Sequence, residues 1–562
     1  MSDKEASKDA PEEEEDWMSY ANTGFGSTDY SLWDEAGEEA ETTEEVNWDE
    51  DDLLHDADDD EIPAAPKPAG LKHLVRMGCC NHCLGRVGGK KRFSQSNFES
   101  GVEIRSSVIE TDPSMSEARD INPLCPFCEN LFEEAPLLAE LIKEAIGERE
   151  CNRLQLGARI PKDQTEAEDH LRKRFGAGGS IPLKSSLVEE VARQLMEIGG
   201  GHNLVVEKPE ILALIDVLTL TVELDIRSHY IYGRYRKLER GIPQTKWPCR
   251  ACKGRGCEKC DQTGLQYKSS VQGLIGDPLL EIFGSEEHAF HGMGREDIDV
   301  RCMGRGRPFV IEMKKPVKRD IDANIITEMI NTSANGSIEV SDIRPSNRSE
   351  VVRVKDTPAE KSYTIRYRIE PITESEFESL TQVMEIPSNN QDRNRRRKNH
   401  HRRKKPEPEP EEIETDYSSL KKAELVELCV EKGLAKSGTK DVLIERLSSF
   451  KEATLPLPEK DYVMEIMTNL QGCTLAQRTP ERVAHRRADK IRKRRVLETS
   501  NPTIEVDNEG NMVAEFSLRC ESGTYVKETV HGDGGRTQPS IASLIKAKCT
   551  VEWLDVADIH AD

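Results

Sequence analysis

Four Cys-x-x-Cys pairs are the feature of this sequence that most restricts its fold. Two such pairs together offer four thiolates to one Zn²⁺ ion, and this use of cysteine implies reduced thiols rather than disulfides. The first two pairs are separated by a long span, whereas the last two are joined by a turn that contains Gly254 and Gly256. Because four thiolates leave no open coordination position, both ions are predicted to be structural. The predicted ligands are Cys80, Cys83, Cys125 and Cys128 for one ion and Cys249, Cys252, Cys257 and Cys260 for the other.

The negative charge of the chain is concentrated at its beginning. The whole sequence carries a formal charge of -25 at pH 7. Residues 1–62 hold 25 Asp or Glu against Lys4 and Lys8, so this segment accounts for -23 and residues 63–562 for about -2. A segment this acidic and this poor in apolar residues cannot offset its ordering entropy, so residues 1–66 are predicted to be a disordered tail. The nearly neutral remainder, with its basic clusters, is compatible with nucleic-acid binding.

The sequence shows neither a secretory signal nor a membrane span. The N-terminus, MSDKEASKDAPEEEEDW, has no apolar core, and no stretch approaches the apolar length that a bilayer requires. We therefore expect a soluble protein of a reducing compartment, the cytoplasm, without membrane partners.

Between the two cysteine units, helical and alternating patterns predict a mixed unit. Ser186 and Glu189 have the spacing of a capping box, and apolar residues follow at helical intervals up to Ile198. Residues 218–226 alternate between apolar and polar, which predicts a half-buried strand. The next stretch, RSHYIYGRYRKLERG, interleaves tyrosines with basic residues, which is typical of RNA contact; an ordinary strand end with solvated charges is the alternative. These tyrosines are Tyr230, Tyr232 and Tyr235.

An acidic pair lies between glycines in the stretch HGMGREDIDVRCMGRGRPFVIE, residues 291–312. Glycine allows a tight backbone path, so Asp297 and Asp299 are suited to the floor of a cleft, and residues 309–313 alternate as a strand does. A carboxylate on a tight loop beside a strand is a candidate catalytic group, and an acidic surface turn is the alternative. The residue types alone do not separate Asp297 from Asp299.

The rest of the chain is predicted to be rich in strands, with one insertion. Residues 363–369 and 512–520 alternate clearly, and the basic run at 477–495, QRTPERVAHRRADKIRKRR, is interpreted as a phosphate-binding segment or else as a solvated helix. The insertion comprises a basic and Pro-Glu-rich linker at 387–415 and a leucine-containing helix pair at 416–452. The helix pair resembles a SAP module, a small domain usually associated with nucleic acid; a protein-docking helix pair is the alternative.

Most of residues 71–562 resemble the archaeal and eukaryotic tRNA pseudouridine synthases of the Pus-ten family. The matching runs are GREDIDVRCMGRGRPFVIE, QRTPERVAHRRADKIRKRR and ESGTYVKETVHGDGGRTQPSI, in the family's order. The resemblance implies an α+β, multi-domain chain. Its expected parts are an N-terminal zinc subdomain (67–145), a THUMP-like RNA-binding domain (146–246), a compact zinc knuckle (247–268) and a catalytic domain with a mixed or antiparallel sheet, in two parts (269–386 and 460–562). The acidic tail and the SAP-like insertion depart from the archaeal pattern and leave the substrate range and partners open.

The resemblance also implies an activity, the isomerisation of uridine to pseudouridine at positions 54 and 55 of the tRNA T-loop. In pseudouridine synthases the essential aspartate follows an arginine with one residue between them. Arg295 and Asp297 have this arrangement, which selects Asp297 over Asp299.

Further site residues follow from the same resemblance. Tyr363 is expected to stack on the uracil ring and to remove its proton. Tyr525 and Lys527 are expected to flank the uracil, with Lys527 paired to the aspartate, and Leu554 to form an apolar wall of the pocket. Arg295 is expected to fill the base stack left by the extruded nucleotide.

The implied chemistry requires no metal or organic cofactor beyond the two structural zinc ions. The expected partner is tRNA, bound at its T-loop and elbow, with other nucleic acid reached through the SAP-like insertion. We expect a monomer, although the sequence does not decide the oligomeric state. The alternative function is a non-catalytic zinc and SAP nucleic-acid-binding protein on the same scaffold. A DnaJ-type chaperone, suggested by the compact cysteine unit, would need a J-domain signature that the sequence lacks.

Overall fold

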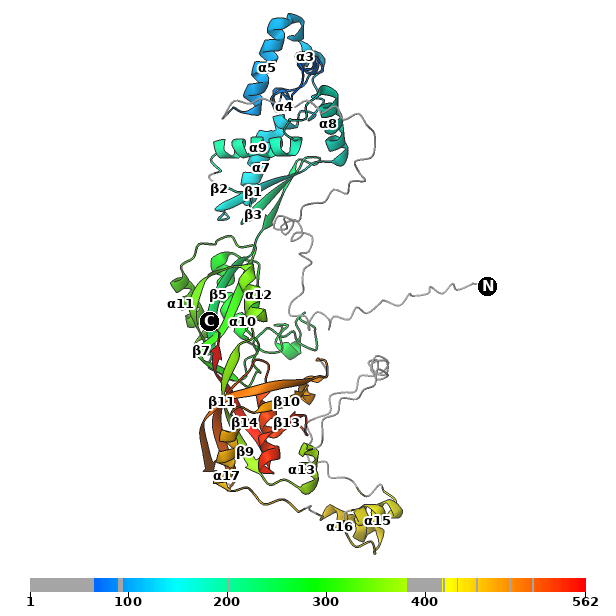
Figure 1. Ribbon diagram of the computed structural model, residues 1–562, viewed down its shortest axis with the longest axis vertical. Helices are drawn as coiled ribbons and strands as arrows, with labels where there is room; N and C mark the ends of the chain where they lie inside the picture. Colours follow the sequence, from blue (N-terminus) through cyan, green and yellow to red (C-terminus); the bar gives the residue numbers. More distant parts are fainter. Residues whose placement is uncertain are drawn as a thin grey trace, which may run out of the picture.

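The computed structural model shows an elongated chain of units, drawn along its length in Figure 1. It describes residues 65–88, 95–200, 203–381, 417, 420–431, 433–450, 453–484, 487–507 and 510–561. Nearly all of the predicted acidic tail and the whole linker at 387–415 lie outside the described residues. Within them, no helix combines the length and the apolarity that a membrane crossing needs.

The N-terminal unit joins a helical, cysteine-containing part to a four-stranded sheet. In this sheet β1 (Arg153–Arg159) pairs in parallel with β2 (Asn203–Leu204) and β3 (Ile211–Asp216), and β3 pairs antiparallel with β4 (Thr221–Ile226). One buried hydrophobic cluster runs from the cysteines through the helices into the sheet, so the two parts share a core. The helices are α3 (Pro68–Arg76), α4 (Asn81–Val87), α5 (Asn97–Thr111), α6 (Ala118–Ile121), α7 (Ala135–Ile146), α8 (Lys162–Phe175) and α9 (Leu183–Glu197).

Two local predictions in this unit are wrong. Helix α9 begins at Leu183, directly after Pro182, so Ser186 is buried inside the helix instead of capping it. The alternating segment 218–226 is a strand only from Thr221 onward, because the residues before it form the turn between β3 and β4. Leu218, which the alternation assigned to a half-buried strand, is 79% exposed in that turn.

A ten-stranded sheet forms the body of the molecule, and with the mixed four-stranded sheet it confirms the α+β class. Its order is β13-β10-β11-β12-β9-β14-β7-β5-β8, with β6 paired to β7. The last strand of the chain, β14, lies between β9 and β7, so strands from before and after the insertion interleave. The strands are β5 (His229–Lys237), β6 (Glu287–Gly292), β7 (Arg301–Lys314), β8 (Ile338–Ser346), β9 (Glu360–Glu370), β10 (Thr474–Arg478), β11 (Ile491–Val506), β12 (Met512–Cys520), β13 (Thr537–Gln538) and β14 (Lys548–His560).

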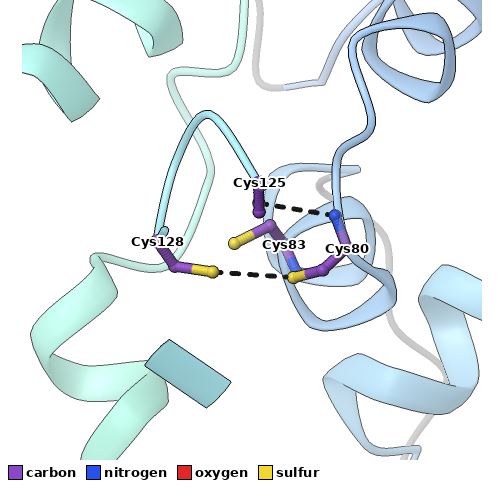
Figure 2. Close-up of side chains that lie close together, drawn as sticks. All are labelled: Cys80, Cys83, Cys125 and Cys128. Carbon is purple, nitrogen blue, oxygen red and sulfur yellow. Dashed lines mark hydrogen bonds between the residues drawn. The ribbon is translucent and has the colours of Figure 1, made fainter. Parts of the chain in front are cut away.

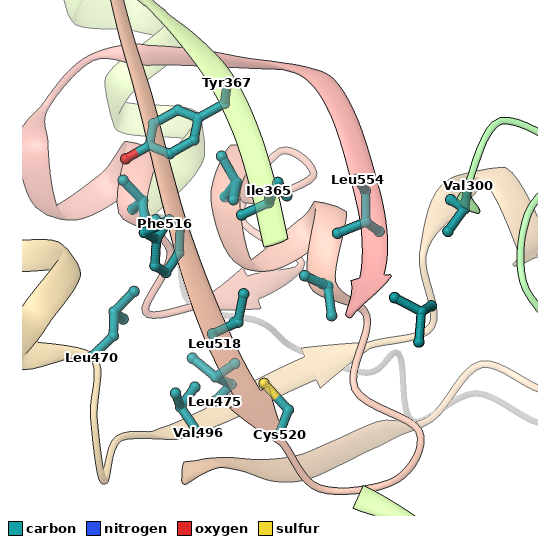
Figure 3. Close-up of a cluster of buried hydrophobic side chains, with 14 of the residues drawn as sticks. Val300, Ile365, Tyr367, Leu470, Leu475, Val496, Phe516, Leu518, Cys520 and Leu554 are labelled. Atoms are coloured by element: carbon teal, nitrogen blue, oxygen red, sulfur yellow. The ribbon is translucent and has the colours of Figure 1, made fainter. Parts of the chain in front are cut away.

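Two hydrophobic clusters pack helices against this sheet. The first holds α10 (Val271–Phe283) and α11 (Ala323–Ala334) against β5, β7 and β8. The second and larger cluster surrounds β9, β12 and β14, as Figure 3 shows for part of it. Its helices are α12 (Arg348–Asp356), α13 (Glu374–Thr381), α17 (Lys460–Asn469), α19 (Val526–His531) and α20 (Ile541–Ile545).

Two predicted RNA-contact segments are built into the large sheet. β5 pairs with β7 on one side and β8 on the other, and Tyr232 and Tyr235 are buried, so the prediction that they offer base-stacking faces is wrong. The basic run at 477–495 is not a long helix. It follows β10 into the four-residue helix α18 (Glu481–Ala484) and returns as β11, antiparallel to β10.

The insertion contributes a separate small unit. Helices α15 (Lys422–Glu431) and α16 (Lys440–Ser448) enclose a core of their own, and they lie apart at one end of the molecule in Figure 1. The chain returns close to where it left: Thr373 and Thr454 form an isolated β-bridge, and the Leu455 N–H donates to the Ile372 carbonyl at 2.8 Å.

Candidate active site and metal centres

The first two cysteine pairs converge although they lie far apart in the chain. Figure 2 shows Cys80 and Cys83, at the start of α4, facing Cys125 and Cys128 on a loop. The four Sγ atoms lie within 4.8 Å of one another, and those of Cys80 and Cys128 are 3.7 Å apart. A regular ZnS₄ tetrahedron with bonds of about 2.3 Å has S–S edges of about 3.8 Å. This donor set therefore fits Zn²⁺.

The last two cysteine pairs form an equally tight group. The Sγ atom of Cys257 lies 4.0 Å from that of Cys249 and 3.6 Å from that of Cys260. The Sγ atoms of Cys252 and Cys260 are 3.8 Å apart. All four Sγ atoms of the group lie within 4.8 Å of one another, so this set also fits Zn²⁺.

The base of this knuckle contacts the loop that carries the acidic pair. Trp247 and Tyr267, which flank the knuckle, make an edge-to-face contact with ring centroids 5.6 Å apart. The guanidinium of Arg295 lies over the Trp247 ring at 5.3 Å from its centroid. Arg295 is exposed, as its predicted contact with RNA requires, and the compact cysteine unit is its neighbour.

Buried polar groups hold the acidic loop, the segment that carries Asp297 and Asp299, in place. The Glu296 carboxylate accepts hydrogen bonds from the Tyr235 hydroxyl at 2.7 and 2.9 Å and forms an ion pair with Arg307, whose Nε lies 2.8 Å from it. Arg307 also donates to the Met293 carbonyl at 2.7 Å. Lys237 Nζ donates to the carbonyls of Asp297 and Ile298 at 3.3 and 2.8 Å. These contacts fix the backbone on both sides of Asp297.

The carboxylate of Asp297 faces two cations from the second part of the chain. Arg482 Nη1 lies 3.1 Å from Asp297 Oδ2, and Lys527 Nζ lies 3.8 Å from the same oxygen. Lys527 is closer to Asp299, at 2.7 Å. Although burial opposes it, this contact with Lys527 lowers the pKa of Asp299. The predicted contact between Lys527 and the aspartate is therefore present, and it is shared between two carboxylates.

Tyr525 and Lys527 are positioned by a buried glutamine. Gln477 on β10 donates from Nε2 to the Tyr525 carbonyl and accepts at Oε1 from the Tyr525 N–H, each at 2.9 Å. Tyr525 stands at the N-cap of α19, so this pair of hydrogen bonds sets where the helix starts and where Lys527 points.

Tyr363 and Leu554 lie on neighbouring strands of the same sheet. Tyr363 is on β9, partly buried against the large cluster, and burial raises the pKa of its phenol, opposed by the charge of Arg307. Leu554 on β14 is buried in that cluster (Figure 3). Arg240 Nη1 donates both to the Leu554 carbonyl, at 3.0 Å, and to the Asp299 carbonyl, at 2.7 Å, so Leu554 adjoins the acidic loop.

Sequence reasoning missed several residues of this site. Arg482 was one of many basic residues in its run, and Glu528 had no pattern that marked it. Glu296 was an acid beside two others, and Arg307 one of several arginines after the loop. Their position in the GREDIDVRCMGRGRP, QRTPERV and ESGTYVKE runs was the only available signal, and it does not reveal which side chains meet.

Comparisons with known proteins identify the same family over most of the chain. The family model described as "Pus10, C-terminal" matches residues 230–430 and 451–560, "Pus10 THUMP domain, archaeal" matches 138–216, and "SAP domain" matches 416–451. A tRNA pseudouridine synthase Pus10 from Methanothrix thermoacetophila is 32% identical, over 86% of this chain and 93% of its own. Those from Methanopyrus kandleri and Thermofilum pendens are 30% and 27% identical, over 86% of this chain and 96% and 92% of theirs. The chain therefore belongs to the Pus10 family of tRNA pseudouridine synthases.

Proposed function

We propose that this protein isomerises uridine to pseudouridine in tRNA, at positions 54 and 55 of the T-loop, with Asp297 as the essential carboxylate. The observation that carries the proposal is the setting of Asp297 in a chain of the Pus10 family: its loop is held by buried polar groups, two cations face its carboxylate, and its charge acts on the phenol of Tyr363. Its relatives are named tRNA pseudouridine synthases, which supports the reaction and not the tRNA positions.

The reaction exchanges one bond to the sugar for another. The bond between N1 of uracil and C1′ of ribose breaks, the ring turns, a bond forms from C5 to C1′, and the C5 proton leaves while N1 gains one. Asp297 supplies the carboxylate, either as a nucleophile or by stabilising developing charge. No cofactor takes part in any of these steps.

Tyr363 is proposed to stack on the uracil and to accept the C5 proton. Because burial raises the pKa of its phenol, the hydroxyl is protonated in the free enzyme at neutral pH. It must therefore release its own proton to water before it takes the C5 proton, and N1 takes a proton from water, so the overall count of protons is unchanged. Tyr525 and Lys527 are proposed to flank the ring, and Leu554 to limit the pocket on its apolar side.

The target nucleotide must leave the T-loop stack, which costs a few kcal/mol. The exposed guanidinium of Arg295 is proposed to occupy the vacated space. Phosphate contacts are proposed for the β10–β11 hairpin, whose basic residues include the exposed Lys493 and Arg495, and for the THUMP domain. The SAP domain is proposed to reach further nucleic acid.

Both cysteine groups are proposed to hold structural Zn²⁺, which would stabilise the local fold without entering the reaction. Thiolate ligands require reduced cysteines, which supports a cytoplasmic protein.

For the domain limits, we propose that the THUMP-like domain ends before β5, because β5 pairs with β7 and β8 of the large sheet. The remaining limits are proposed as the sequence predicts them, and the protein is proposed to be monomeric.

The test is incubation with an unmodified tRNA transcript and mapping of pseudouridine by carbodiimide treatment and primer extension. We expect modification at 54, 55 or both, lost in Asp297→Asn while tRNA affinity is nearly unchanged. Asp299→Asn is the matched control, since it lies two residues away and shares Lys527. Loss of activity in Asp299→Asn alone would move the essential role to Asp299. Tight binding without modification by the folded, zinc-loaded wild type would favour the non-catalytic alternative.

A further inference from the structure

Arg482 joins two carboxylates that come from different parts of the chain. Its Nη1 lies 3.1 Å from Asp297 Oδ2, and its Nε donates to Glu528 Oε1 at 2.7 Å. Arg482 belongs to α18, in the connection between β10 and β11, whereas Glu528 belongs to α19. One guanidinium therefore bridges the acidic loop and the helix that carries Lys527.

Glu528 has the properties of an anchor. Its side chain is 1% exposed, and among the described residues Arg482 is the cation that pairs with it. A buried carboxylate is costly unless it is paired, so Glu528 holds the guanidinium strongly in one place. The planar fork of arginine can serve two carboxylates at once, which a lysine ammonium on a flexible stem does poorly.

Arg482 is also the cation nearest to Asp297. Lys527 Nζ lies 0.7 Å farther away, at 3.8 against 3.1 Å, and makes its close contact with Asp299 instead. Asp297 is 41% exposed, so without a near cation its carboxylate would be free to turn toward solvent. The geometry thus gives Arg482 the larger part in orienting Asp297.

We infer that Arg482 is a positioning residue: anchored by Glu528, it holds the Asp297 carboxylate directed at the substrate. This inference rests on the proposed function of Asp297. It adds that the carboxylate is correctly set only when the β10–β11 connection is docked against α19. The hairpin proposed to contact tRNA phosphates and the reacting carboxylate are thereby coupled through one side chain.

Steady-state kinetics on tRNA separates this role from a simple phosphate contact. Arg482→Ala is expected to lower kcat by about 100-fold, because misplacing a reacting group by about 1 Å costs that much, with KM nearly unchanged. Arg482→Lys, which keeps the charge, is expected to recover part of kcat. Lys493→Ala, on the same hairpin, is the matched control and should raise KM while leaving kcat alone. A raised KM with wild-type kcat in Arg482→Ala would overturn the inference.

Removing Arg482 alone leaves Glu528 buried and unpaired, which could unfold the region. The double variant Arg482→Gln/Glu528→Gln removes both charges and avoids this cost. It is expected to be folded, by circular dichroism, and to show the same loss of kcat. Wild-type kcat in the folded double variant would refute the role of Arg482.

A second readout does not depend on activity. Crystal structures of the wild type and of the double variant give the direction of the Asp297 carboxylate. In the double variant the carboxylate is expected to turn away from its wild-type position, because the guanidinium that lies 3.1 Å from its Oδ2 is gone. An unchanged carboxylate position would overturn the inference even if wild type modified no tRNA, and a turned carboxylate beside an inactive wild type would instead point to a wrong substrate.

Discussion

Replacing Glu296 by alanine tests whether the acidic loop is held from beneath. The Glu296 carboxylate is fully buried, accepts two hydrogen-bond contacts from Tyr235 at 2.7 and 2.9 Å and one from Gln244 at 3.2 Å, and pairs with Arg307 at 2.8 Å. Truncation leaves the buried Arg307 guanidinium without its carboxylate. Breaking a buried pair in this way costs about 3–5 kcal/mol, so Glu296→Ala should lower the free energy of unfolding by that amount.

The comparison that isolates this effect is Glu287→Ala. Glu287 pairs with Lys314 at 2.7 Å on the neighbouring strand β6, but its side chain is 62% exposed. An exposed pair contributes only about 0–1 kcal/mol, so this variant should be nearly neutral. The double variant Glu296→Met/Arg307→Met, which buries no lone charge, should regain much of the loss.

Hydrogen exchange in urea is the suitable assay, because a multi-domain chain does not unfold in one two-state step. Amides of β7 and β9 report the unit that holds the loop. A difference of less than about 1 kcal/mol between Glu296→Ala and Glu287→Ala would show that the buried pair does not hold the loop.

Three further predictions concern metal, mechanism and pH. Purified protein should contain about two zinc ions per chain by elemental analysis, and Cys260→Ser about one; a value near zero in wild type would contradict both metal assignments. Tyr363→Phe keeps the ring but not the hydroxyl, so tRNA affinity should persist while kcat falls about 100-fold, and an unchanged kcat would remove its role as proton acceptor. Burial, and to a lesser extent the charge of Arg307, lowers the pKa of Lys361 from 10.5 to about 8. The ammonium of Lys361 therefore destabilises the folded state fully below pH 8, and this destabilisation disappears as the pH rises from 8 to 10.5. Lys361→Met should therefore stabilise the large sheet at pH 7 more than at pH 10, by urea unfolding followed with a spectroscopic probe placed in that sheet; equal gains would argue against a charge effect.

Local sequence patterns correctly predicted those features that are determined by residues close together in the chain. Alternation placed residues 363–369 and 512–520 in strands, which are β9 and β12, and cysteine spacing found both metal-ligand groups. The same reasoning failed for Tyr232 and Tyr235, because alternating aromatic and basic residues look like a surface strand. Both faces of β5 are in fact covered: Tyr235 packs in the cluster of α10 and α11, and Tyr232 packs in the larger cluster.

The arrangement around Asp297 could not be predicted from patterns of this kind. Arg482 is 185 residues away along the chain, and its contact depends on how the β10–β11 connection docks against the acidic loop. Family resemblance selected Asp297 and Lys527, but it did not show that Lys527 divides its charge between Asp297 and Asp299. Contacts between distant segments follow from tertiary packing, which no local spacing records.

The β-bridge between Thr373 and Thr454 has a consequence for how this chain is joined together. Helix α13, which follows Thr373, still packs in the large hydrophobic cluster, whereas the helix pair α15 and α16 has a core of its own. The size of this helix pair therefore places no demand on the strands of the large sheet. The strands of the large sheet from before and after the insertion are interleaved, since β14, near the end of the chain, pairs with both β9 and β7. The covalent link through the insertion is therefore not what keeps the two parts of the large sheet together. A chain of this topology can carry, exchange or lose a small domain between α13 and Thr454 while its sheet stays intact.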